Sequence, residues 1–426
     1  MYLILGLGIS SIAVINKLKE LNKKMIIVVN KEEIDKARKY DELVVDYDNL
    51  RYLNLDKIKY CIKSPGIPYY HKSVIYLRKN NIKVINEIEL AYILANKKGK
   101  YIGVTGSVGK SSVVSLLYEL IKAKHDNVIL AGNIGVPLIS KIDEINNDTI
   151  IILEVSSFQI DDFISMKFHI ALLLNIYDNH LDFYKSKKKY YLSKFKITNN
   201  QSKKDYFITR FDNDIINEYI DLDKINSTLI DYKSDYSIYY NNLYYKSQRL
   251  FDISSYKLEG KHNFDNLLAC ISVLNILNIN VSEEVINNFH TLKYHLDKKI
   301  INNITFINDS KSTCTSSLKG AIDTYKSKNL ILLFGGYNKN LDFEFLNNYS
   351  FKRIICFGKL ASELDENVNV DSKFESLKLA LDYTLMIARP NDIVLFSPGC
   401  ASFDEFKNYI SRGEFFDNYL RNYYAK

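Results

Sequence analysis

Short apolar runs alternate with amphipathic helical patterns along most of this chain. A first helix is expected after the opening strand, and another from Lys261 to about residue 277. The runs that predict strands are 2–5, 25–29, 60–62, 84–85, 101–105, 150–154, 170–175, 304–307, 330–334, 353–357 and 393–396. Strands that alternate with helices favour parallel sheets, so the pattern predicts an α/β protein.

The length and the spacing of these runs suggest three domains. A chain of 426 residues is long enough for about three domains of roughly 150 residues each. We expect an N-terminal Rossmann-like domain over 1–92, a central P-loop ATPase-type domain over 93–292, and a C-terminal Rossmann-like domain with a doubly wound sheet over 293–426. Residues 203–256 alternate short apolar and polar stretches, which predicts extra strands and surface loops.

Composition narrows the class of protein. Hydrophobic residues make up 47% and charged residues 25%, and the net charge is only +7. The lysines at 185–189 are interpreted as a solvated face, so nucleic-acid binding is not expected, while a mild positive balance suits an anionic substrate. The five cysteines are dispersed, which argues against a disulfide framework or a zinc site. No apolar run approaches the ~18 residues that span a membrane, and the N-terminus predicts a strand, so we expect a cytoplasmic protein without a membrane partner.

The segment that follows the apolar run 101–105 predicts a phosphate site. It reads Thr105-Gly-Ser-Val-Gly-Lys-Ser-Ser112 and leads into an amphipathic helix. Gly106 and Gly109 permit a tight turn whose N–H groups can face phosphate oxygens. Lys110 supplies a positive charge for the phosphates, and the Ser111 hydroxyl is suited to Mg²⁺. The spacing is shorter than the standard Walker A pattern, because Val104 stands where that pattern has glycine.

Two further strand ends in the central segment carry metal-binding side chains. Glu154 ends an apolar strand, as the acid of a Walker B strand does, and is placed to ligate Mg²⁺. His180 follows the strand at 170–175 and is flanked by Asp178 and Asp182. Ligands bind at the carboxyl ends of strands in open α/β sheets, so we interpret His180 as a functional residue.

The N-terminal segment begins with Gly6-x-Gly8, a turn that could hold a nucleotide diphosphate. Binding of NAD is disfavoured, because Ser11 replaces the third glycine and Asn30 stands where an acid would bind the ribose. A rigid Ser64-Pro-Gly loop follows the strand at 60–62. Glu87 and Glu89 are expected to be solvated acids at a helix start.

Polar clusters follow three strands of the third segment. They occupy 308–313, 335–339 and 397–404. Because strand-end loops carry the sites of open sheets, three such clusters together predict a binding region.

At this point the residues resemble the Mur ligase family. The motifs run in the family's order over nearly the whole chain: Gly-x-Gly, Ser64-Pro-Gly, the T-G-x-x-G-K loop, Gly132-Asn-Ile-Gly, Glu154-Val-Ser-Ser-Phe-Gln, Asn175–Asp182, Gly260-x-His-Asn-x-x-Asn266, Asn308-Asp-Ser-Lys, Gly335-Gly and Ser397-Pro-x-x-Ala-Ser-x-Asp404. The Ser-Ser-Phe-Gln and Ser-Pro-x-x-Ala-Ser motifs, with Lys407, resemble those of the member that adds D-glutamate.

The resemblance implies an ATP-dependent ligase that adds D-glutamate to UDP-N-acetylmuramoyl-L-alanine through an acyl phosphate, in peptidoglycan precursor synthesis. It also implies two Mg²⁺ ions and carbamylation of Lys194 by CO₂, although the sequence alone shows only a surface lysine there. A monomer is expected. The implied catalytic residues are Lys110, His180, Lys194 and Lys311. The implied ATP-binding residues are Gly106, Ser107, Gly109, Lys110, Ser111, Ser112, Asn266 and Asp309. The implied metal ligands are Ser111, Glu154, His180 and carbamylated Lys194. The implied UDP-substrate residues are Gly8, Ile9, Ser10, Ser64, Asn133, Ser157 and Gln159, and the implied D-glutamate residues are Lys339, Ser402 and Tyr409.

Several positions depart from the family pattern. Leu296 stands where an arginine is usual, which removes a phosphate contact unless a nearby lysine such as Lys298 or Lys299 substitutes for it. The other departures are Asn30, Lys31, Val108, Asn179 and Tyr409. Two alternatives stay open: a ligase of the same family with another acceptor, such as a diamino acid or the glutamate of folate, and a nucleotide-binding regulatory module that hydrolyses ATP without ligation.

Overall fold

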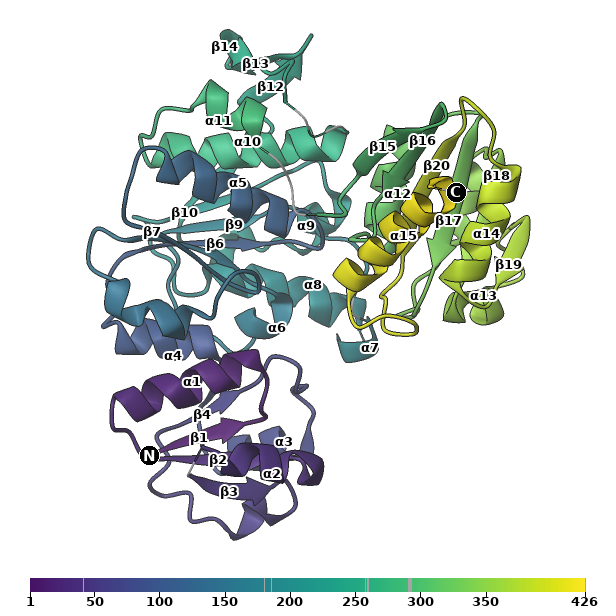
Figure 1. Cartoon of the computed structure of the whole chain (residues 1–426). Coiled ribbons are helices and arrows are strands. Elements are labelled where there is room, and N and C mark those ends of the chain that lie inside the picture. Colours follow the sequence, from purple (N-terminus) through teal and green to yellow (C-terminus); the bar gives the residue numbers. More distant parts are fainter. Residues whose placement is uncertain are drawn as a thin grey trace.

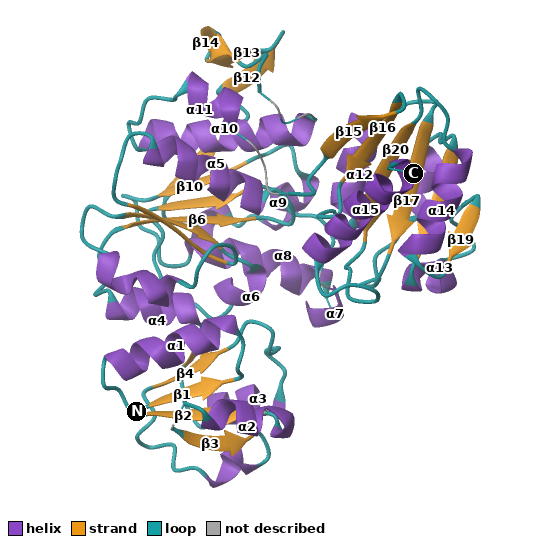
Figure 2. Ribbon diagram, in the orientation of Figure 1, coloured by secondary structure: helices purple, strands orange, loops and turns teal. Residues whose placement is uncertain are grey.

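Three α/β domains follow one another along the chain. The computed structural model describes residues 1–40, 42–179, 181–184, 186–256, 258, 260–289 and 293–425. Figure 1 shows the N-terminal domain at the bottom, the central domain above it and the C-terminal domain on the right. Figure 2 shows helices against the sheets in each domain, as the predicted α/β class requires.

The N-terminal domain contains a parallel sheet in the order β3-β2-β1-β4-β5. This is the Rossmann-like order, with β1 at the point where the strand order reverses. Its strands are β1 (Tyr2–Leu5), β2 (Met25–Val29), β3 (Leu43–Asp46), β4 (Tyr60–Lys63) and β5 (Val84–Ile85), and its helices are α1 (Ile9–Glu20), α2 (Ile34–Arg38), α3 (Lys72–Lys79) and α4 (Glu87–Leu94).

The central domain has a parallel sheet in the order β11-β10-β9-β6-β8-β7, with β6 inside it. Its strands are β6 (Lys100–Thr105), β7 (Val128–Gly132), β8 (Ile150–Glu154), β9 (Ile170–Leu173), β10 (Tyr206–Thr209) and β11 (Thr228–Asp231). Its helices are α5 (Lys110–Lys122), α6 (Ser157–Ile160), α7 (Leu181–Tyr184), α8 (Lys187–Phe195), α9 (Asp214–Tyr219), α10 (Lys261–Ile276) and α11 (Glu283–Asn288).

The extra strands predicted within 203–256 are present, and they divide between two sheets. Strands β10 and β11 extend the central sheet. A separate antiparallel sheet consists of β12 (Tyr236–Tyr239), β13 (Asn242–Tyr245) and β14 (Gln248–Asp252) and stands at the top of Figure 1.

The C-terminal sheet has the order β15-β16-β20-β17-β18-β19. The predicted parallel sheet is correct for every pair except the edge strand β15, which is antiparallel to β16. The strands are β15 (Asp297–Ile301), β16 (Ile304–Asn308), β17 (Leu330–Gly335), β18 (Arg353–Phe357), β19 (Ser372–Phe374) and β20 (Ile393–Gly399), and the helices are α12 (Thr315–Thr324), α13 (Lys359–Glu363), α14 (Leu377–Ile387) and α15 (Tyr409–Tyr424).

Helix α4 connects the first two domains. It packs against the 3-10 helix Leu138–Glu144, and one apolar cluster continues from the N-terminal sheet into the central one. Glu87 and Glu89, expected to be solvated, are instead 4% and 0% exposed. The Glu87 carboxylate accepts from the backbone N–H of Ile139 at 2.5 Å, and Glu89 accepts from that of Met166 at 2.9 Å. Both acids therefore cap backbone groups of the central domain. The predicted boundary at residue 92 falls within α4, and the domain boundaries stay predictions.

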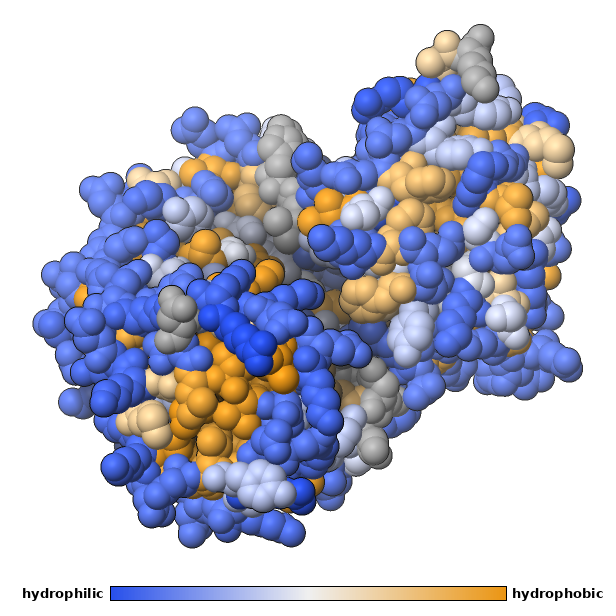
Figure 3. All heavy atoms as spheres, turned by 60° about the horizontal axis from the view of Figure 1, so that its bottom comes forward, coloured by the Kyte–Doolittle hydropathy of each residue, from blue (hydrophilic) through white to orange (hydrophobic). Residues whose placement is uncertain are grey.

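The face in Figure 3 is mostly hydrophilic, with apolar residues gathered at the lower left. No helix in the described ranges is long and apolar enough to cross a membrane.

Candidate active site

The loop between β6 and α5 has the geometry of a phosphate cradle. Gly109 has a φ of +86°, and a Cβ there would lie 2.6 Å from Asn266 Oδ1. Only glycine fits this left-handed position beside α10. Helix α5 begins at Lys110, so its positive dipole end faces the loop.

Asn175, after β9, holds the loop in place. Its Oδ1 accepts from the backbone N–H groups of Ser107 and Val108 at 3.1 and 3.0 Å, and its Nδ2 donates to the carbonyl of Val108 at 3.1 Å. The Ser107 hydroxyl is also bonded to that of Tyr190 at 2.9 Å. A neighbouring strand end thus fixes the backbone of the cradle.

Two lysines share one carbonyl beneath the loop. Lys110 Nζ donates to the Gly106 carbonyl at 2.8 Å, and Lys194 Nζ donates to it at 3.0 Å. Lys194 is only 2% exposed, so the expectation of a surface lysine was wrong. Burial, reinforced by the charge of Lys110, brings the pKa of Lys194 well below its usual value. Burial also lowers the pKa of Lys110, although Glu154 opposes that shift.

Glu154 ends β8 beside this loop and is 2% exposed. Its Oε1 accepts from Asn133 Nδ2 at 2.8 Å, and its Oε2 has no hydrogen-bond partner among the described residues. A buried carboxylate oxygen without a partner is costly unless a cation occupies the space beside it.

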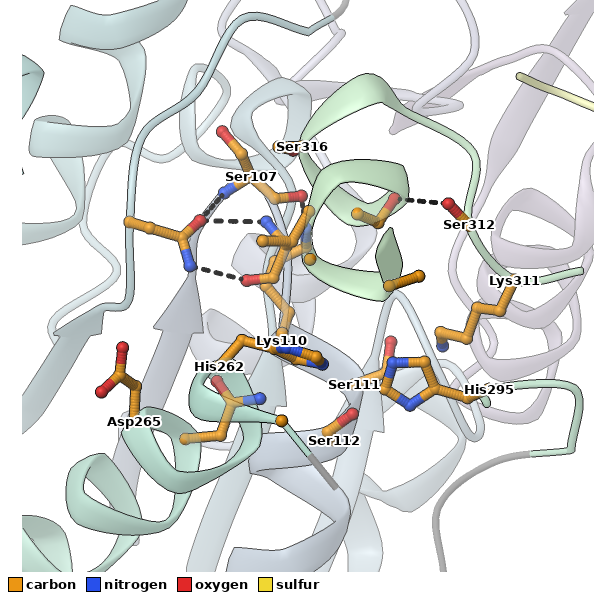
Figure 4. A pocket seen from close by; sticks show the side chains of 18 of the residues that line it. Ser107, Lys110, Ser111, Ser112, His262, Asp265, His295, Lys311, Ser312 and Ser316 are labelled. Carbon is orange, nitrogen blue, oxygen red and sulfur yellow. Dashed lines mark hydrogen bonds between the residues drawn. The ribbon is translucent and has the colours of Figure 1, made fainter. Parts of the chain in front are cut away.

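These groups face a cavity of about 1030 Å³ between the central and C-terminal domains. Figure 4 shows Lys110 and Lys311 entering it from the two domains. The lining includes Ser107, Val108, Gly109, Lys110, Ser111, Ser112, Asn133, Glu154, Asn175, Arg210, Asp265, Asn266, His295, Leu296, Asp309, Lys311, Lys319 and Tyr409.

The C-terminal side of the cavity contains perturbed titratable groups. Burial raises the pKa of Asp309 to about 8, although Ser397 Oγ donates to its carboxylate at 2.7 Å. Burial lowers the pKa of Lys311 to about 8, and its ammonium lies 5.5 Å from the ring centre of Tyr409. Perturbed groups gathered in a cavity are typical of an active site.

Comparisons with known proteins agree with this arrangement. Residues 104–274 match the Mur ligase middle domain. The chain is 31% identical to the UDP-N-acetylmuramoylalanine–D-glutamate ligase of Caldicellulosiruptor bescii over 98% of this chain and 96% of that protein. The chain belongs to the Mur ligase family. It is thus an ATP-dependent ligase that forms an amide bond.

Other Mur ligases support this assignment. The enzyme of the same name from Bacillus cereus strain G9842 is 30% identical over 97% of this chain and 96% of its own length. Among solved structures, MurF from Thermotoga maritima, in complex with ADP, has a TM-score of 0.60 at 16% identity, with 92% of each chain covered. MurC from the same organism has a TM-score of 0.60 at 16% identity over 100% of both chains. These two structures show the three-domain Mur ligase fold.

Most of the predicted ATP and metal residues of this Mur ligase come together. Gly106 is not in the lining, but its carbonyl accepts both lysines. The predicted residues that line the cavity are Ser107, Gly109, Lys110, Ser111, Ser112, Asn133, Glu154, Asn266, Asp309, Lys311 and Tyr409. Their roles stay predictions.

The predicted metal site can be followed only in part. His180 lies outside the described residues. Within the described ranges, no group of three or more His, Cys, Asp or Glu side chains is arranged to hold a metal ion.

Asn133, one of the predicted UDP-substrate residues, lines the cavity, and the other six lie in two groups. Gly8 lies beside Ser64, since a Cβ on Gly8 would be 3.6 Å from Ser64 Oγ. Ile9 follows at the start of α1 and is 80% exposed, with Ser10 next to it. In the second group, Ser157 and Gln159 are buried on α6, where Gln159 Oε1 accepts from the Ser156 N–H at 2.8 Å. Gln159 thus caps its own helix in this structure.

Two of the three predicted D-glutamate residues, Lys339 and Ser402, lie on adjoining loops. Tyr337 and Ala401 exchange backbone hydrogen bonds of 2.9 and 3.1 Å, which brings the Lys339 loop beside the Ser402 loop. Tyr409 begins α15 and lines the cavity.

Lys298 and Lys299 are the two candidates to replace the arginine missing at position 296. Neither lines the cavity, and Lys299 pairs with Asp417 at 2.5 Å. Both precede β16 on the antiparallel edge strand β15, and both are exposed there. Lys319, on α12, is a basic residue that does line the cavity.

Sequence reasoning missed several residues at the site. Asn175 was visible only as part of a motif, and its contacts with the loop depend on the order of the strands. Arg210 and Asp265 both line the cavity and pair at 2.8 Å. Arg412 is fully buried behind the C-terminal loops. An isolated arginine in a helical pattern carries no signal of burial.

Proposed function

We propose that this Mur ligase joins D-glutamate to UDP-N-acetylmuramoyl-L-alanine in peptidoglycan precursor synthesis. The observation that carries the proposal is the cavity in which the phosphate cradle, Glu154 and Lys311 meet, with Tyr409 at its C-terminal side. Two relatives at 30% identity or more, both named for D-glutamate addition, match over nearly their full length.

The residues support a phosphoryl-transfer mechanism. Lys110 and the N–H groups of the loop bind the phosphates of ATP, and the γ-phosphoryl group passes to the substrate carboxylate. The amine of D-glutamate then attacks the acyl phosphate, the C–O bond to phosphate breaks, and ADP and phosphate are released. Such reactions depend mainly on positioning and on neutralising charge. Lys311 supplies charge from the opposite wall.

The donor set fits Mg²⁺. Glu154 Oε2 is buried and has no hydrogen-bond partner in the described ranges, and Ser111 lines the same cavity. Oxygen ligands of this kind suit Mg²⁺, which neutralises phosphate charge when bound. We include two ions in the proposal, with His180 as a further ligand.

The surroundings of Lys194 fit carbamylation. Burial brings the pKa of the Lys194 amine well below its usual value, which increases the share of the uncharged form, and the uncharged amine is the form that reacts with CO₂. The carbamate would bring a negative charge next to Lys110. CO₂-depleted buffer should therefore lower activity, and bicarbonate should restore it, whereas Lys194→Ala should show no response to bicarbonate.

Phosphate release tests the proposed function. The enzyme is given ATP, Mg²⁺ and UDP-N-acetylmuramoyl-L-alanine, with D-glutamate, L-glutamate or L-lysine. Release that needs both the nucleotide substrate and D-glutamate, with a product heavier by one glutamyl unit, supports the proposal. A preference for L-lysine would assign another acceptor, and release that ignores all acceptors would indicate an ATPase. We also propose that the enzyme is a monomer in the cytoplasm. Light scattering tests the oligomeric state.

A further inference from the structure

Arg412 is a buried cation at the base of the C-terminal loops. It lies in the first turn of α15, is 1% exposed, and is among the largest fully buried side chains of the protein. It forms no ion pair with any described residue. Asp309, Asp404 and Glu405 are close enough to influence it electrostatically, but none is bonded to it.

The guanidinium is held by backbone carbonyls instead. Its Nη2 donates to the carbonyls of Ser310 and Cys400 at 2.9 and 3.0 Å, and its Nη1 donates to the carbonyl of Ala401 at 3.1 Å. Its Nε donates to Ser310 Oγ at 3.1 Å. The planar fork of donors suits this arrangement, because it reaches acceptors on separate loops at once.

These acceptors belong to the loops that follow β16 and β20, and a third loop lies against the same side chain. A Cβ on Gly336, after β17, would lie 3.1 Å from Arg412 Nη1 and 2.5 Å from the Ala401 carbonyl. That carbonyl also accepts from the Tyr337 N–H at 2.9 Å. The guanidinium therefore joins the loops after β16 and β20 by hydrogen bonds and packs against Gly336 of the loop after β17.

We propose that Arg412 is the positioning residue of the amino-acid acceptor pocket. It ties the loop of Ser402 to the loop after β16, and Gly336 at the start of the loop of Lys339 packs against it. The inference rests on the proposed function, in which these loops bind D-glutamate. Burying a cation without a carboxylate partner is costly. An apolar side chain would avoid that cost, but it would leave the carbonyls without the guanidinium donors and would remove the hydrogen bonds between the loops after β16 and β20.

The nucleotide side of the cavity has its own supports. The Asp309 N–H donates to the Phe396 carbonyl at 2.8 Å, and the Lys311 N–H donates to the Tyr294 carbonyl at 2.9 Å. Neither bond involves Arg412. Arg412 does bond Ser310, which lies between these two residues, but the backbone bonds of Asp309 and Lys311 do not depend on it, so loss of the guanidinium is expected to disturb acceptor binding more than ATP binding.

The test separates formation of the acyl phosphate from its attack by the acceptor. Hydroxylamine reacts with acyl phosphates in place of an amino acid and gives a hydroxamate, so it reports the first step without the acceptor pocket. Arg412→Lys keeps the charge but not the fork of donors. We expect its KM for D-glutamate to rise at least tenfold, with the KM for ATP and the rate of hydroxamate formation within twofold of wild type.

Controls make the result specific. Arg421→Lys, the same change at an exposed position of α15, should match wild type in every measurement. Ser310→Ala removes the acceptor of Nε together with the hydrogen bond from Ser310 Oγ to the Tyr409 carbonyl at 2.8 Å, and it should raise the KM for D-glutamate by about threefold. The Ser310→Ala variant also tests the proposal if Arg412→Lys fails to fold.

An unchanged KM for D-glutamate in folded Arg412→Lys would overturn the proposal, as would equal losses in hydroxamate formation and in use of D-glutamate. If Arg412→Lys does not fold, a wild-type KM in Ser310→Ala overturns it. A wild-type enzyme that forms hydroxamate but ignores D-glutamate contradicts the proposed acceptor, which is a separate result.

Discussion

Asn175→Ala is expected to loosen the phosphate cradle without touching any group that contacts ATP. The side chain makes three hydrogen bonds to the loop, at 3.0–3.1 Å, and is 7% exposed. At about 1 kcal/mol for each hydrogen bond, the ordered conformation of the loop loses about 3 kcal/mol of stabilisation. Part of the free energy of ATP binding must then order the loop. The affinity for ATP should therefore fall roughly 100-fold, since about 1.4 kcal/mol corresponds to each factor of ten.

The assay is calorimetric titration with a non-hydrolysable ATP analogue, supported by the KM for ATP from phosphate release. Asn200→Ala is the matched control. Its Nδ2 donates to the carbonyls of Ile164 and Met166 at 3.2 and 2.9 Å, in the same domain but outside the cavity. The control should bind ATP as wild type does.

Asn175→Asp distinguishes ordering from charge. The aspartate keeps an acceptor for the two N–H groups, loses the donor to Val108, and brings a negative charge beside the phosphates. Its affinity for ATP should recover in part when salt is raised, whereas that of Asn175→Ala should not. An ATP affinity of Asn175→Ala within threefold of wild type would refute the reasoning, because the loop would then be ordered without the hydrogen bonds of Asn175.

Three further predictions concern charge. The phosphates of bound ATP stabilise the charged form of Lys311, and burial lowers the pKa of this lysine in the free enzyme to about 8. ATP binding should therefore take up a proton near pH 8 and weaken above it, and titration in buffers of different ionisation enthalpy should show no such uptake in Lys311→Met. Burial raises the pKa of Glu87 to about 7, so the stability it contributes is complete below its unfolded pKa of about 4.3 and is lost as pH rises through 7. Glu87→Gln should have a higher Tm than wild type at pH 8 and a similar one at pH 5. Lys63 and Asp162 pair at 3.0 Å and are each 2% exposed, so Asp162→Asn should cost about 3–5 kcal/mol in urea unfolding. The double change Lys63→Met with Asp162→Leu should recover most of that loss, and equal losses in both variants would contradict the argument.

The sequence determined the elements and the chemistry that depend on neighbouring residues. The strand at Arg353–Phe357 was predicted to the residue, and β20 begins where predicted but extends to Gly399. Apolar runs between polar turns suffice for such predictions, because strands are short and a buried parallel strand needs apolar side chains on both faces. The phosphate loop could also be predicted from the sequence, since its glycines, Lys110 and the helix that follows are contiguous.

The tertiary structure decided which charged side chains became buried. Lys194, Glu87 and Arg412 are charged residues on helices, and charged side chains are expected at the surface, yet other segments cover each of them. Their partners are 88, 52 and 102 positions away in the chain, at Gly106, Ile139 and Ser310. Burial and pairing at such separations result from packing between segments, and local sequence patterns carry no signal of it.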